Sequence, residues 1–248
     1  MTTSTWVTTS STFRPSFVDA PVTPGPPTGL AAPVSLLGAR VHFTGRDEGD
    51  LRPARESTAS QLAAIAGRPV SWLRQVHGSR VVVVDGPVPV TGMEGDALVT
   101  ARPDAALAVF TADCAPVALA SPEGVVAAVH AGWAGLVAGV VDRSVEVMRD
   151  LGATRVEAAL GPCIHAGCYE FGADDLDRAG ASLGPAVRAS TAEGRPAFDL
   201  PAAVGAALAR AGADLVFDAS VCTACSTAGL YSHRARADAG RQAMVVWR

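Results

Sequence analysis

Three side chains of the metal-ligand type lie far apart in the chain, each beside an apolar segment. His77 precedes the β-branched run RVVVV, Cys114 follows AVFTAD, and His130 ends VVAAVH. Two imidazoles and one thiolate suit Zn²⁺, and three protein ligands leave a fourth coordination position open, as in catalytic zinc sites. A water in that position has a pKa of about 7, so hydroxide becomes available near neutral pH. The residue types therefore predict a catalytic zinc centre.

The spacing of these residues leaves a second interpretation open. It matches none of the short zinc-finger patterns. Histidines that only form hydrogen bonds at strand ends, together with a buried and unreactive cysteine, would give the same pattern. Asp113, next to Cys114, is expected to accept a hydrogen bond from a ligand imidazole or to carry a proton. Asp113 and Cys114 are the predicted catalytic pair.

The elements that must position these residues follow from the apolar pattern. Helical spacing predicts helices over residues 60–66, 136–151 and 201–210. Alternation and β-branched runs predict strands over residues 39–44, 80–84, 105–111, 116–120, 125–130, 156–160 and 244–247. The order predicts one α/β domain, and its short connections favour a mixed sheet. Strand ends of such domains open into the loops that carry functional sites.

Composition limits the classes of function and partner. The chain has 248 residues and a net charge of −4, which argues against nucleic acid as a main partner. Five cysteines and no secretory-type N-terminal segment indicate reduced thiols in a cytoplasmic protein. No apolar run is long enough to span a membrane. Residues 1–33, rich in Thr, Ser and Pro, are expected to be a disordered tail before a catalytic domain over residues 34–248.

Several further segments make the chain resemble a bacterial family. It is the multicopper polyphenol oxidase (laccase) domain family, also described as purine nucleoside phosphorylase and as peptidoglycan editing factor. The resemblance runs in the family's order over about residues 39–248 and implies a mixed-sheet α/β sandwich (α+β) related to the deamidase domain of a bacterial toxin. The matching segments are RQVHGSRV (74–81), EGDALVT (94–100), TADCAPV (111–117), VHAGWAG (129–135), GPCIHAGCYEFG (161–172), FDL (198–200), CTACS (222–226), and YSHRA with GRQAM (231–244).

The resemblance implies that zinc, or less readily copper, is bound by His77, Cys114 and His130. It implies phosphorolysis of adenosine, inosine, guanosine or methylthioadenosine, with adenosine deamination as a second activity. The substrates are then a purine nucleoside and phosphate, and Arg46 is the first candidate for the phosphate, with Arg234 as the second. Position 134 is Ala, where family members usually carry Arg. Nothing in the sequence indicates an oligomeric state.

Two other functions remain open at this stage. A copper-dependent polyphenol oxidase would fit the older family name, but five histidines are too few for a four-copper centre beside the assigned ligands. A peptidoglycan editing factor acting on cell-wall precursors is the other alternative.

The cysteine pair in CTAC has two interpretations of its own. Cys222 and Cys225 could form a redox pair or half of a zinc site. The sequence contains no second such pair, which favours a structural role. His233 and Trp133 are weaker candidates for contact with the substrate.

Overall fold

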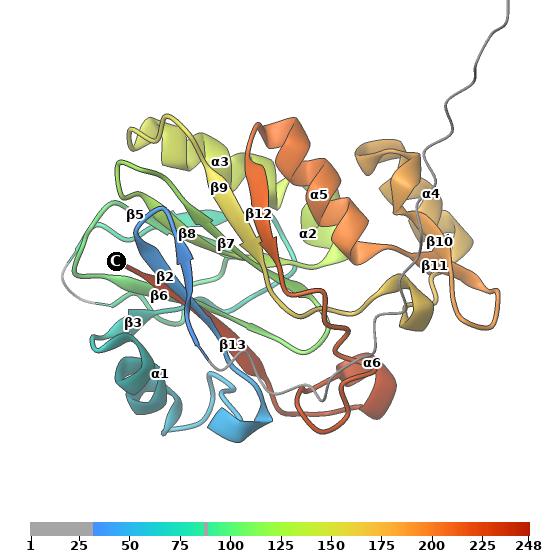
Figure 1. Cartoon of the computed structure of the whole chain (residues 1–248), viewed down its shortest axis with the longest axis horizontal. Helices are drawn as coiled ribbons and strands as arrows, with labels where there is room; N and C mark the ends of the chain where they lie inside the picture. The colour runs from blue at the N-terminus through green and yellow to red at the C-terminus, as the bar shows by residue number, and fades with distance from the viewer. Residues whose placement is uncertain (1–31, 87–88) are drawn as a thin grey trace, which may run out of the picture.

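Two β-sheets packed face to face, with helices on both outer faces, make up the protein (Figure 1). The computed structural model describes residues 32–86 and 89–248. Nearly all of the tail expected over residues 1–33 lies outside this range. The first strand begins at Val34. The fold is a mixed α/β single domain, as the sequence predicts.

The five-stranded sheet has the order β1-β2-β13-β6-β3. Its central strand, β13, is antiparallel to both β2 and β6, whereas β3 is parallel to β6. The strands are β1 (Val34–Leu36), β2 (Ala39–Phe43), β3 (Val70–Ser71), β6 (Ala106–Thr111) and β13 (Gln242–Trp247).

The six-stranded sheet has the order β12-β9-β7-β8-β5-β4. Two strand pairs at its edges are parallel and the inner pairs are antiparallel, so the predicted mixed sheet is confirmed. The strands are β4 (Val81–Val83), β5 (Ala97–Thr100), β7 (Ala115–Ala120), β8 (Val126–Ala131), β9 (Glu157–Leu160) and β12 (Asp214–Asp218).

Alternating side chains explain how the sheets and helices share their apolar residues. In β8, Val126 and Ala128 pack into the core between the sheets, whereas Ala127 and Val129 pack toward the helices. Because both faces of the strand are buried, its sequence is a continuous apolar run. His130 follows the same alternation and points into the space between the two sheets.

The helices cover the outer faces of the two sheets. The helices α3 (Val140–Asp150) and α5 (Leu200–Ala211) pack on the six-stranded sheet, and α1 (Thr58–Ala66) packs on the five-stranded sheet (Figure 1). None of the helices within residues 32–86 and 89–248 is long and apolar enough to cross a membrane. The remaining elements are α2 (Trp133–Val137), α4 (Ala173–Leu183), α6 (His233–Arg236), β10 (Arg188–Ser190), β11 (Pro196–Phe198) and the 3₁₀ turns Arg46–Glu48, Ala166–Cys168 and Pro185–Val187.

The single helix predicted over residues 136–151 is wrong. Two helices occupy this region, and α2 ends before Ala138 whereas α3 begins after Gly139. Gly139 has a φ of 82°, in the left-handed region that glycine adopts without steric strain. A left-handed residue cannot continue a right-handed helix, so the chain changes direction there. The apolar spacing continues through the break, which is why periodicity alone does not reveal it.

Candidate metal centre and cavity

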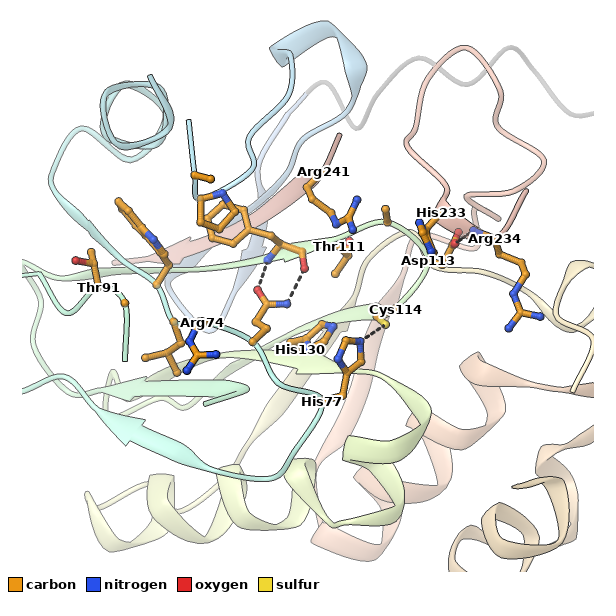
Figure 2. A pocket seen from close by; sticks show the side chains of 18 of the residues that line it. Arg74, His77, Thr91, Thr111, Asp113, Cys114, His130, His233, Arg234 and Arg241 are labelled. Carbon is orange, nitrogen blue, oxygen red and sulfur yellow. Dashed lines mark hydrogen bonds between the residues drawn. The ribbon is translucent and has the colours of Figure 1, made fainter. Parts of the chain in front are cut away.

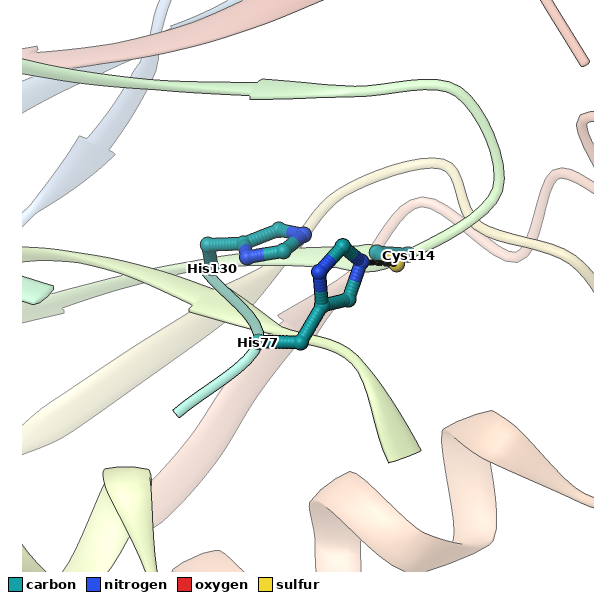
Figure 3. Close-up of side chains that lie close together, drawn as sticks. All are labelled: His77, Cys114 and His130. Carbon is teal, nitrogen blue, oxygen red and sulfur yellow. Dashed lines mark hydrogen bonds between the residues drawn. The ribbon is translucent and has the colours of Figure 1, made fainter. Parts of the chain in front are cut away.

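The chain crosses from one sheet to the other near the three predicted ligands. Cys114 lies in the crossing from β6 to β7, and His77 lies in the crossing from β3 to β4. His130 comes from β8 itself. The structure thus brings together the three residues that are far apart in sequence (Figure 3).

The geometry of the three side chains fits a tetrahedral ion. The His77 Nε2 atom lies 3.8 Å from the Cys114 Sγ atom. One donor atom of each residue, including His130, lies within 4.8 Å of the others. Zn–N and Zn–S bonds of roughly 2.0–2.3 Å require donor separations of about 3.3–3.8 Å, so small side-chain movements suffice. His130 is buried, Cys114 is half-buried and His77 is exposed, which leaves one side open to a ligand.

A buried carboxylate orients the centre. Asp96 is fully buried, and its Oδ1 atom lies 2.9 Å from the Nδ1 atom of His130. Its two oxygens also accept the backbone N–H groups of Val76, His77 and Gly78 at 2.7–3.3 Å. A carboxylate partner on Nδ1 directs the Nε2 atom of His130 toward the ion. The Asp96 carboxylate therefore holds the side chain of one ligand, His130, and the backbone of another, His77.

The backbone around the ligands adopts conformations that only tight packing sustains. His77 and Asp113 have φ values of 60° and 107°, which are unusual for residues other than glycine. A Cβ atom at Gly132 would lie 3.0 Å from His77 Cδ2 and 3.2 Å from Cys114 Sγ. Only glycine lets the start of α2 approach the ligands so closely.

The Cys114 thiol and the His130 imidazole shift each other's pKa. Burial raises the pKa of the Cys114 thiol, but the neighbouring His130 outweighs burial and lowers this pKa to about 6. Burial lowers the pKa of His130, yet the facing Cys114 thiolate and Asp96 raise it to about 9. Each group thus favours the charged form of the other, a thiolate beside an imidazolium. A thiolate is the form that binds metal ions.

The centre lies in the wall of a large cavity of about 870 Å³. Its lining combines aromatic rings, arginines and the three candidate ligands (Figure 2). This volume is in the range of cavities that hold small organic ligands. The lining includes His77, Cys114, His130, Trp72, Phe110, Tyr169, Asp113, His233, Arg74, Arg234 and Arg241.

Asp113 and Arg234 both line this cavity and contact each other. The Asp113 carboxylate accepts the Arg234 backbone N–H and the Thr223 hydroxyl, each at 2.7 Å. The Arg234 guanidinium lies over the Tyr169 ring at 4.9 Å and donates to the Glu170 carbonyl. Asp113 is thus hydrogen-bonded to α6, which carries Arg234, and the carboxylate that bonds a ligand imidazole is Asp96.

Arg46 does not line the cavity. Its guanidinium bonds Asp238 at 2.6 Å and the Leu230 carbonyl at 2.9 Å, and it lies 4.3 Å from the centroid of the Tyr231 ring. Asp238 also accepts the backbone N–H of Ser232, the N-cap residue of α6. Arg46 therefore supports the segment in which Arg234 lies.

The sequence patterns do not single out every residue of the site. Asp96 stands in the segment EGDALVT, where an acidic residue directly before a buried strand is an identifiable pattern. Arg241 and Tyr169 have no such pattern, because they reach the cavity from segments far along the chain. Trp133 packs against Phe171 and is not among the residues that line the cavity.

The fold and the site together define a two-sheet α/β domain with a candidate His₂Cys metal centre in the wall of a cavity. The chain belongs to the multi-copper polyphenol oxidoreductase laccase family, whose family model matches residues 40–248. This is the family that the sequence motifs resemble.

Curated relatives are similar over most of the chain. A protein from Mycobacterium tuberculosis named purine nucleoside phosphorylase is 43% identical over 205 residues, which cover 80% of this chain and 81% of the relative. A protein of the same name from Streptomyces coelicolor is 44% identical over 209 residues, covering 82% and 84%.

Solved structures share the fold. A crystal structure from Neisseria meningitidis matches with a TM-score of 0.75 and 26% identity, covering 87% of this chain and 98% of the other. The crystal structure of YlmD from Geobacillus stearothermophilus matches with a TM-score of 0.70 and 25% identity, covering 88% and 92%. The α/β sandwich is therefore the fold of this family.

Proposed function

We propose that this protein is a zinc-dependent purine nucleoside phosphorylase. It splits adenosine, inosine, guanosine or methylthioadenosine with phosphate into the free base and ribose 1-phosphate. The observation that carries the proposal is the His77–Cys114–His130 centre in the wall of a cavity that also presents arginines and aromatic rings. Relatives named purine nucleoside phosphorylase, 43–44% identical over about four fifths of the chain, support it.

Arginines on the cavity wall are suited to hold the phosphate. Among the described residues, no carboxylate lies within ion-pair distance of Arg234, so its guanidinium is available to an anion. Arg241 is directed toward the middle of the cavity (Figure 2) and donates through one nitrogen to the carbonyls of Asp238, Ala239 and Gly240. A planar guanidinium binds phosphate oxygens in pairs. Arg234 and Arg241 therefore replace Arg46 as the first candidates.

Aromatic rings offer a place for the purine. Trp72, Phe110 and Tyr169 all line the cavity, and the Trp72 and Phe110 rings meet edge to face with centroids 6.3 Å apart. Flat aromatic side chains stack on nucleobases with little loss of side-chain entropy.

The donor set favours zinc as the ion. Cysteine and histidine ligands suit zinc, and a bound zinc ion supplies Lewis-acid stabilisation of charge in the reaction. A multi-copper centre has less support, because few histidines remain as ligands. Of the five histidines, His42 bonds Glu48, and neither His165 nor His233 belongs to the cluster of donor atoms within the described range.

Asp113 is the proposed proton carrier. Each of its oxygens accepts one hydrogen bond from the protein and keeps a second lone pair. A carboxylic acid beside a metal centre is also the arrangement of zinc deaminases, so adenosine deamination to inosine is a second proposed activity.

The test is a product assay on metal-loaded protein. Adenosine with phosphate should yield adenine and ribose 1-phosphate, and removing the metal with a chelator should abolish this. Cys114→Ser should lose the activity, whereas Arg234→Gln or Arg241→Gln should raise the KM for phosphate. Arg143→Gln, on the exposed face of α3 and paired with Glu146, is the matched control and should behave as wild type.

One result would contradict the proposed nucleoside reaction. If the zinc-loaded protein forms neither base nor inosine from any purine nucleoside, the nucleoside reaction is wrong. Altered muropeptides after deletion of the gene would then favour the cell-wall editing alternative.

A further inference from the structure

Three cysteines outside the cavity wall form a second cluster of donor atoms. The sulfur atoms of Cys168, Cys222 and Cys225 lie within 4.8 Å of one another. The Cys168 and Cys225 sulfurs are 3.4 Å apart. Cys168 ends a 3₁₀ turn, and the two other cysteines come from a loop more than fifty residues further along the chain. The fold therefore brings a third thiol to the CTAC pair.

We propose that Cys168, Cys222 and Cys225 form a second metal site, which binds a thiophilic ion, zinc, through three thiolates. The three thiols release their protons to solvent as they bind, and a water or an external ligand completes the coordination. This site is separate from the His77–Cys114–His130 centre and does not depend on the proposed reaction.

The distances fit a zinc–thiolate tetrahedron. Zn–S bonds of roughly 2.3 Å require sulfur atoms about 3.8 Å apart. The observed spread, from 3.4 Å to less than 4.8 Å, brackets that value. Cys222 and Cys225 also have the C-x₂-C spacing that places two thiolates on one zinc ion in many structural sites.

The loop that carries two of the thiols is held rigidly. The Arg236 guanidinium donates to the carbonyls of Thr223 and Ala224 at 3.2 and 2.9 Å. The Ser226 N–H donates to the Cys222 carbonyl at 3.0 Å, which closes the turn. A loop fixed in this way loses little conformational entropy when an ion binds.

A backbone amide supports the sulfur of Cys222. The His165 N–H points at this sulfur from 3.4 Å. Hydrogen bonds from backbone amides to sulfur are a common feature of metal–thiolate centres, where they stabilise the negative charge. Cys225 is exposed and the two other cysteines are half-buried, so an ion from solvent can reach the cluster.

The second cluster is connected to the first centre by a buried hydrogen bond. The hydroxyl of Thr223, inside the CTAC loop, donates to Asp113 at 2.7 Å. Asp113 precedes the ligand Cys114. An ion on the CTAC loop would therefore also steady the wall of the cavity.

The test is a count of zinc per chain in full-length protein purified under reducing conditions without chelators. Elemental analysis and native mass spectrometry should find two zinc ions in the wild type and one in Cys225→Ser or Cys168→Ser. Cys114→Ser should also keep one, held by the cysteine cluster. Cys163→Ser is the control, because Cys163 is a buried thiol outside both clusters, and it should keep two.

A second measurement on the wild type does not depend on the folding of any variant. In zinc-loaded protein, Cys168, Cys222 and Cys225 should resist alkylation by a maleimide, and removal of zinc should expose them. Peptide mass spectrometry identifies the modified residues.

Two outcomes would overturn the second site. One is a single zinc ion in the wild type that persists in Cys225→Ser. The other is a Cys168–Cys225 disulfide in non-reduced protein whose reduction leaves the zinc count at one, which would make the cluster a thiol–disulfide pair instead.

Discussion

Replacing Asp96 with asparagine tests how the metal centre is built. The carboxylate accepts His130 Nδ1 and three backbone N–H groups while fully buried. Asparagine keeps the shape but turns one acceptor oxygen into an N–H₂ donor. If the remaining oxygen stays on His130 and His77, the new donor faces the N–H of Gly78, and neither group has a partner.

The size of the effect follows from these contacts. An unsatisfied buried donor costs about 1–3 kcal/mol, and a hydrogen bond to a charged group contributes about 1.5–3 kcal/mol. We expect D96N to lose about 3 kcal/mol of unfolding free energy, or roughly 6–12 °C in melting temperature for a domain of this size. Because the His130 and His77 ligands lose their orientation, zinc affinity should fall about 10- to 100-fold.

The stability difference between wild type and D96N should depend on pH, and the pKa of Asp96 gives the direction. Burial would raise the pKa of Asp96, but the hydrogen bonds from His130 and the Gly78 N–H outweigh it and lower the pKa. The pKa of Asp96 is therefore lower in the folded protein than in the unfolded chain, where it is about 3.9. The ionised carboxylate stabilises the fold at pH values above the unfolded-state pKa. This stabilisation is lost as the pH falls through the folded-state pKa. The difference in melting temperature between wild type and D96N should therefore shrink below about pH 4.

Thermal melting of metal-free protein and competition with a chelating dye measure the two effects separately. Asp104→Asn is the control, because Asp104 is exposed on the surface beside Arg102. Its stability should stay within about 0.5 kcal/mol of wild type. A D96N protein that is destabilised but binds zinc within twofold of wild type would refute the claim that Asp96 orients the ligands.

Three further predictions concern the centre and the core. Gly132→Ala should weaken zinc binding with little loss of helix stability, because its Cβ would press on His77 and Cys114; unchanged zinc affinity would contradict this. In Cys225→Ser, where only the His77–Cys114–His130 centre should bind zinc, binding between about pH 6 and pH 9 should release one proton from the protein, from His130, while Cys114 is already a thiolate; calorimetry in buffers of different ionisation enthalpy measures it, and no release would contradict the assigned charges. Met148→Ala should cost about 2–5 kcal/mol in urea denaturation because this side chain is fully buried; a loss below 1 kcal/mol would contradict its place in the core.

The sequence predicted best those elements whose apolar pattern is complete within one segment. The strands β6, β7 and β8 were predicted to within one residue at each end, because their side chains are buried on both faces. The strand β12 was missed, since most of its residues are exposed at the sheet edge and carry charges at both ends. The helix α4 was also missed. Its segment ADDLDRAGASL has amphipathic spacing, but the three acidic residues make the short apolar pattern difficult to recognise.

Site residues could be predicted only where a reactive side chain stands next to a recognisable strand in the same segment of the sequence. Asp113, next to Cys114 in sequence, was expected to be a hydrogen-bond acceptor beside the ligands or a proton carrier, and the sequence named no carboxylate partner for His130. The structure gives that contact to Asp96, because β5 and β8 are antiparallel neighbours and Ala97 pairs with Val129. Arg46 was the first candidate for phosphate, yet Asp238 engages it from almost two hundred residues away. Such pairings depend on strand register, which no local pattern encodes.

The convergence of the three ligands has a topological cause. Two connections, one after β3 and one after β6, each take the chain from the five-stranded sheet to the six-stranded sheet. Both crossings pass the same end of the space between the sheets, where His130 emerges from β8. Hydrogen-bonded strands of one sheet lie about 4.8 Å apart, whereas facing sheets are about 10 Å apart. Loops that bridge the wider gap leave room for a cavity beside them, so the topology that brings the ligands together also creates the space for a substrate.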